Sequence, residues 1–210
     1  MRTVKTFLLL IATASTVFFS CGEDPDPNEI VSDIYFQATV DGEIRTYQID
    51  VNDYINIVGD FTAGADADNE NQFIPFTCVA SDDALSSPSG LANSGAVGII
   101  ITSTDNLNPE QVGDQITTGT MNYGTRSYDT PDPATPGAFV SWVDPTGAEW
   151  TTNGDQSNST FEITAYADEE NAASNSHKVI TANFSCTLYN GSGGSISLTD
   201  GRVRGRMIVY

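Results

Sequence analysis

Residues 179–189, with the sequence VITANFSCTLY, alternate between polar and small or apolar side chains. Ala182, Phe184, Cys186 and Leu188 recur at every second position, so in a β-strand they would all face the same side. The polar residues between them would face the other side. The segment therefore predicts a strand with one face in the core and one face toward solvent.

Segments of the same kind recur along the chain, separated by Gly, Asn, Asp, Pro and Ser. They predict an all-β fold with almost no helix. We expect a single antiparallel β-sandwich, jelly-roll or immunoglobulin-like, over residues 34–210. The candidate strands are Ile34–Val40, Glu43–Ile49, Ile55–Gly59, Phe73–Ala80, Ala96–Ser103, Gln115–Met121, Ala138–Asp144, Ala148–Thr152, Thr160–Ala167, Val179–Tyr189, Ser195–Thr199 and Arg202–Tyr210.

Three turns have a specific physical basis. Asp41–Gly42 and Asp200–Gly201 each suit the positive-φ pair of a type I′ hairpin between adjacent strands. Asp144–Gly147 has the sequence DPTG, which fits a type I turn followed by a left-handed glycine in a G1 bulge. This three-residue loop places Trp142 opposite Trp150.

The first 21 residues have the pattern of a bacterial lipoprotein signal. Two basic residues precede an apolar run over residues 7–19, and Ser20 lies directly before Cys21. Threonine and serine interrupt the run, whereas a stable transmembrane helix needs about 20 strongly apolar residues. We predict a cleaved signal peptide over residues 1–20 and a diacylglycerol on Cys21. Secretion without a lipid and an uncleaved anchor are the alternatives.

Residues 21–33 are acidic and rich in proline near their start, so we expect them to form an extended tether. A short acidic run directly after the lipidated cysteine resembles the surface-export signal of lipoproteins in Bacteroidetes-type bacteria. The alternative is a solvated linker without a sorting role.

Charge excludes one class of partner. The chain has 28 acidic and eight basic residues, and the signal contains two of the basic ones but none of the acidic ones. The mature chain would therefore have a formal charge of −22. Because binding to phosphates needs clustered Lys and Arg, we expect no nucleic-acid partner.

Cys78 and Cys186 remain after lipidation, and each lies in an alternating segment that turns it toward the core. A disulfide between them would close a loop of about 100 residues and contribute up to about 4.7 kcal/mol. The alternative is two buried thiols that act as small apolar side chains.

Catalytic and metal signals are sparse. His177 is the single histidine and lies in a polar stretch, and no serine has the surroundings of a nucleophile elbow, so we expect no enzyme. Asp66, Asp68 and Glu70 alternate in an acidic loop whose oxygen ligands suit calcium. The alternative is a solvated loop, and we expect no other cofactor.

Glycan recognition depends on aromatic side chains near turns: Tyr123, Tyr128, Trp142 and Trp150. Sugars stack their C–H faces on such rings, while nearby amides and carboxylates bind their hydroxyl groups. The alternative, which we favour for the tryptophans, is a cross-strand pair that covers one face of a sheet.

Arg202, Arg204 and Arg206 also alternate, so they share one face of the last strand. They would bind lipid phosphates or an acidic partner, or, as we favour here, neutralise neighbouring acids.

Two regions carry a family resemblance. Residues 38–42 (ATVDG) and residues 181–203, which include TANFSCTLY and ISLTDGRV, resemble the opening strand and closing hairpin of small outer-membrane lipoproteins of Bacteroidetes-type bacteria. Ala182 stands where that pattern usually has glycine, and Val203 where it has phenylalanine. The resemblance implies a β-sandwich at the cell surface and transfers no active site.

These observations favour a non-catalytic lipoprotein, anchored in the outer membrane and exposed at the cell surface, that binds a ligand or partner through its loops. The alternatives are a glycan-binding module of a polysaccharide-uptake system and a structural subunit of an outer-membrane complex.

Replacing Cys21 by alanine tests the anchor. Without the sulfur no acyl chains attach, and about 0.8 kcal/mol of membrane affinity per buried methylene is lost. We expect mass spectrometry to find acyl mass on the native chain and none on Cys21→Ala, which should leave the membrane fraction. A native chain without acyl mass would contradict the prediction.

Overall fold

The computed structural model describes residues 28–49, 54–56, 64–65, 71–81, 94–102, 116–125, 135–168 and 177–208. These residues form strands and no helix, which confirms the all-β prediction. The signal peptide and most of the tether lie outside the described residues. The strands are β1 (Tyr35–Val40), β2 (Glu43–Gln48), β3 (Tyr54–Asn56), β4 (Gly64–Ala65), β5 (Asn71–Ser81), β6 (Ser94–Thr102), β7 (Gly119–Thr120), β8 (Gly137–Val143), β9 (Glu149–Thr151), β10 (Thr160–Asp168), β11 (His177–Tyr189) and β12 (Ser195–Ile208).

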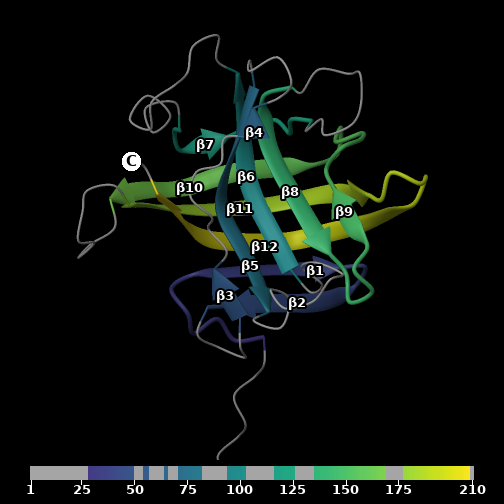
Figure 1. The fold of residues 1–210 in the computed structure, drawn as a ribbon, viewed down its shortest axis with the longest axis horizontal. Coiled ribbons are helices and arrows are strands. Elements are labelled where there is room, and N and C mark those ends of the chain that lie inside the picture. Colours follow the sequence, from purple (N-terminus) through teal and green to yellow (C-terminus); the bar gives the residue numbers. More distant parts are fainter. Residues whose placement is uncertain are drawn as a thin grey trace, which may run out of the picture.

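The strands join one antiparallel network in the order β2-β1-β12-β11-β9-β8-β6-β5-β3, with β10 on β11, β7 on β10 and β4 on β5. The sequence predicted a β-sandwich; in the structure the two groups of strands belong to one network and are connected through β9, where Thr151 pairs with Tyr189. In Figure 1, β5, β6 and β8 run steeply across β10, β11 and β12.

The core lies between these two groups. On β11, the alternate residues Ile180, Ala182, Phe184, Cys186 and Leu188 are each at most 5% exposed, which confirms the predicted inner face. A hydrogen bond connects β8 with β2 across the core: the indole Nε1 of Trp142 donates to the hydroxyl of Tyr47 at 3.0 Å. The twenty buried residues of this cluster come from both groups of strands, so one core holds the fold together.

Two of the predicted turns are confirmed. Asp41 and Gly42 have φ values of 48° and 84° and connect β1 to β2. In the loop between β8 and β9, the amide of Asp144 donates to the carbonyl of Ala148 at 3.0 Å, and Gly147 has φ 86°. This G1 bulge places Trp142 opposite Trp150.

The predicted hairpin at Asp200–Gly201 is wrong. β12 runs through both residues without turning, and they form a β-bulge against its neighbours. On β11, Phe184 pairs with Gly201 and Cys186 with Leu198, so β12 has one residue more than β11 in this interval. Asp200 has φ 52°, and a bulge uses the same left-handed conformation as a hairpin turn.

The last residues of the predicted tether are bonded to the sheet. The side chain of Gln48 accepts hydrogen bonds from the amides of Val31 (2.6 Å) and Ser32 (3.0 Å) and donates to the carbonyl of Glu29 (2.8 Å). One glutamine thus satisfies three backbone groups that a free linker would expose to water.

One edge of β11 is shared by β10 and β9, and Gln156 lies where these two strands separate. Its Nε2 donates to the carbonyls of Thr152 (3.0 Å) and Thr187 (2.7 Å). Its Oε1 accepts from the amide of Thr187 (3.2 Å) and the hydroxyl of Ser159 (2.6 Å). The side chain therefore replaces the ladder bonds that β11 loses at this point.

We expect Gln156→Ala to lower the free energy of unfolding by about 1–3 kcal/mol, because it leaves these backbone groups without partners. Urea denaturation followed by circular dichroism measures the change. Asn158→Ala, an exposed amide in the same loop, is the matched control and should change little. Equal stability of the two variants would contradict this role for Gln156.

Candidate functional site

Tyr123 lies against the core rather than on the surface. Its hydroxyl lies 3.1 Å from the carbonyl of Thr160 and 3.3 Å from that of Ser185, and its ring meets Phe161 edge-on at 5.9 Å. Burial raises the pKa of the Tyr123 phenol, and neighbouring Cys186 raises it further. Both the ring and the hydroxyl of half-buried Tyr123 thus have partners within the protein, which favours a structural role for this side chain.

The tryptophans are structural as well. Trp142 is 7% exposed, and half-buried Trp150 donates its Nε1 to the Oδ2 of Asp144 at 3.1 Å. The pair follows the cross-strand alternative that the sequence favoured. Tyr128 lies outside the described residues.

Cys186 is a free thiol, buried at 5% exposure. Burial raises the pKa of its thiol to about 12, although a hydrogen bond with Tyr123 acts in the opposite direction. The thiol is therefore neutral and unreactive at physiological pH. Cys186 thus fits the alternative of a buried thiol that acts as a small apolar side chain. The side chain of Cys78, on β5, lies outside the described part of the chain.

The predicted calcium loop, with Asp66, Asp68 and Glu70, also lies outside the described residues. Within the described ranges, no three His, Cys, Asp or Glu side chains gather closely enough to hold a metal ion. His177 begins β11, but its side chain is not described.

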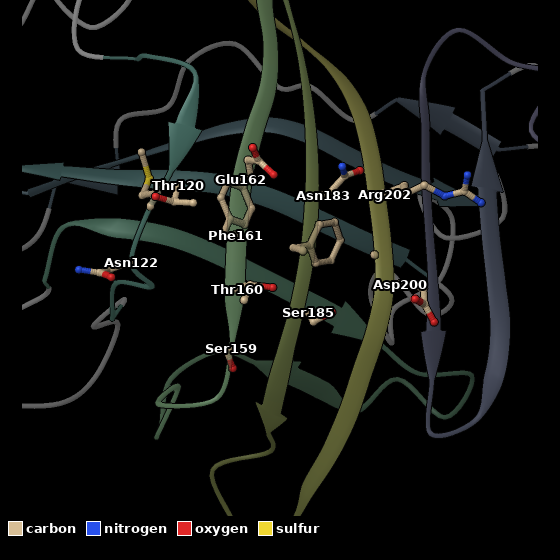
Figure 2. A pocket seen from close by; sticks show the side chains of 13 residues that line it. Thr120, Asn122, Ser159, Thr160, Phe161, Glu162, Asn183, Ser185, Asp200 and Arg202 are labelled. Atoms are coloured by element: carbon tan, nitrogen blue, oxygen red, sulfur yellow. The ribbon is translucent and has the colours of Figure 1, made fainter.

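The described surface has an open groove of about 1120 Å³ across β7, β10, β11 and β12. Figure 2 shows the side chains that line it. On the opposite side of the same strands, the core rings of Phe161 and Phe184 are 1% and 3% exposed and stack at 6.1 Å. The groove thus lies on a well-packed sheet face, which keeps its lining residues in place.

A row of polar side chains crosses the groove from strand to strand. Thr120 pairs with Glu162, Glu162 with Asn183, and Asn183 with Arg202. All four residues are exposed. Adjacent strands lie about 4.8 Å apart, so the row extends for about 14 Å. It offers a hydroxyl, a carboxylate, an amide and a guanidinium in succession, with Thr160 and Ser185 beside it.

Arg202 is oriented by a buried neighbour. Its guanidinium donates to the Oε1 of Gln37 at 2.5 Å, and Gln37 is 5% exposed. The Nε2 of Gln37 donates in turn to the hydroxyl of Thr46 (2.8 Å) and the carbonyl of Asn28 (2.7 Å). Figure 2 shows Arg202 extending from β12 toward β1. A fixed glutamine thus holds the guanidinium at one end of the row.

Sequence reasoning did not find this groove. Its polar residues occupy the outward positions of three strands, where polar residues are ordinary. The missing information is the register, which places Glu162, Asn183 and Arg202 side by side although up to 40 positions separate them. The alternation of Arg202 with its neighbours was the one usable signal.

Comparisons with protein-family models, curated proteins and solved structures find no match to this chain. Within the described ranges, there is no helix with the length and apolar character of a membrane span. The resemblance to outer-membrane lipoproteins therefore depends on the quoted sequence motifs.

Asp144 gives a test of the Trp142–Trp150 hairpin. Partial burial raises the pKa of its carboxyl, but hydrogen bonds from Thr146, Trp150 and Ala148 outweigh this effect and lower the pKa below its usual value. Because the folded pKa is depressed, the carboxylate stabilises the hairpin above the usual carboxyl pKa. This contribution is lost as the pH falls through the folded value.

We expect the NMR signal of the Trp150 indole N–H to shift as the pH falls below the usual carboxyl pKa, and Asp144→Asn to abolish this shift. Asp155→Asn, in the next turn, is the control and should retain it. A shift that persists in Asp144→Asn would contradict the assignment of the Trp150 partner.

Proposed function

We propose that this protein is a lipid-anchored, surface-displayed protein of the outer membrane that binds a glycan in the groove across β7, β10, β11 and β12, without chemical turnover. The observation that carries the proposal is the cross-strand row of Glu162, Asn183 and Arg202. The anchor and the location rest on the sequence of residues 1–29 and on the family resemblance.

The chemistry of the row suits hydroxyl-rich chains. A sugar hydroxyl both donates and accepts hydrogen bonds. The row supplies an acceptor at Glu162, a donor and an acceptor in the amide of Asn183, and a donor at Arg202. The length of the row, about 14 Å, accommodates more than one sugar unit. The exposed hydroxyls around it extend the same chemistry along the strands.

The position of two potentially nucleophilic side chains, the Tyr123 phenol and the Cys186 thiol, also supports a binding role. Tyr123 and Cys186, whose pKa values are raised, do not line it, and both are bonded within the core. A buried thiol or phenol with a raised pKa is a poor nucleophile, since the ionised form is the reactive one. The groove is a sheet face rather than the loop cluster that the sequence suggested.

Glu162→Gln tests the proposal. Replacing the carboxylate with an amide weakens its hydrogen bonds to sugar hydroxyls, and we expect affinity to fall about fivefold to tenfold. The measurement is calorimetric titration of the full-length protein in detergent with the strongest uncharged binder from a glycan array.

The matched control is Glu149→Gln, an exposed carboxylate on β9 away from the groove. It should bind like the unchanged protein. If the array gives no binder, or if both variants bind alike, the groove is not the glycan site.

A further inference from the structure

The last strand carries a stripe of three guanidinium groups beside the groove. Arg202, Arg204 and Arg206 alternate with Val203 and Gly205, which are buried. Successive members of the stripe are about 6.8 Å apart along the strand. In a chain with 28 acidic and eight basic residues, this is a local concentration of positive charge.

The structure shows how two of these groups are held. Arg202 donates to the neutral amide of Gln37, and the Nε of Arg204 is buried without a hydrogen-bond partner. Neither residue forms an ion pair with an acid in the described part of the chain. The sequence favoured neutralisation of neighbouring acids, but these two guanidinium groups are not neutralised in that way.

An un-neutralised guanidinium with spare N–H groups is a site for an oxyanion. Its planar fork matches the two oxygens of a carboxylate or sulfate, and such charge-assisted bonds are about twice as strong as neutral ones. The pairing register places Arg204 beside half-buried Tyr35 on β1, so an aromatic residue borders the same spot.

We propose that Arg202 and Arg204 make the groove selective for an acidic glycan, one that carries carboxylate or sulfate groups. The inference rests on the proposed glycan-binding function and names its ligand class. The polar row binds the sugar hydroxyls, and the arginine stripe binds the charged substituents.

Two other anionic partners fit less well. Glu162 and Asp200 line the same groove and would repel a densely charged phosphate surface, whereas a glycan carries its charges at intervals. An acidic peptide would typically add to a free strand edge, but the groove crosses β10, β11 and β12, which are paired with neighbours.

The test uses pairs of polymers in which one member is charged and the other neutral: polygalacturonate and its methyl ester, and dextran sulfate and dextran. We expect the full-length protein in detergent to bind at least one charged form about tenfold or more tightly than its partner. The member that is preferred identifies the carboxylate or the sulfate as the recognised group.

Arg204→Gln should remove this preference while affinity for the neutral form stays. The matched control is Arg45→Gln on β2, whose guanidinium also has a buried Nε without a partner and pairs with Glu43. It should keep the preference. If Arg204→Gln does not fold, the unchanged protein still decides, because added salt should weaken binding of the charged form only.

Equal affinity for charged and neutral forms, with Glu162→Gln still weakening both, would overturn the inference and leave the proposed function standing. If the unchanged protein binds none of these glycans, both the inference and the proposed function are wrong. Binding to phosphatidylglycerol vesicles that Arg204→Gln abolishes, without any preference among the glycans, would assign the stripe to a membrane and also overturn the inference.

Discussion

The edge of β11 that faces away from β12 has to serve two strands, and the rest of the structure depends on how this is achieved. β10 occupies the edge as far as Ser185, and β9 takes it at Tyr189. Gln156 bonds across the gap between them. β10 lines the groove, whereas β9 pairs with β8 and so connects to β6 and β5 on the other side of the core. The two groups of strands therefore separate where β10 ends and β9 begins along β11.

Gln37 connects three further parts of the molecule. It accepts from Arg202 in the groove, donates to Thr46 on β2, and donates to the carbonyl of Asn28, where the described chain begins. Asn28 is seven positions after Cys21, a distance of at most about 25 Å when fully extended. With Cys21 acylated, as we propose, the arginine end of the groove would lie close to the membrane surface.

The sequence was a good guide wherever one local pattern determines one structure. The alternation in β11 specifies its inner face, and Pro145 with Gly147 leaves little choice of turn between Trp142 and Trp150. It was a poor guide where a local conformation has two uses, since a left-handed Asp200 suits a hairpin and a bulge equally. The sequence offered Tyr123, beside a turn, as a candidate glycan contact, whereas in the structure its hydroxyl lies 3.1 Å and 3.3 Å from two carbonyls distant in sequence.

The bulge at Asp200 also sets the phase of β12. Leu198 and Val203 both face the core, although five positions separate them and a regular strand would put them on opposite sides. The one inserted residue reverses the alternation between them. If β12 ran through these residues as a regular strand, without the bulge, Leu198 inside would turn the arginines inward and Val203 outward, so the bulge decides which side of the sheet is cationic.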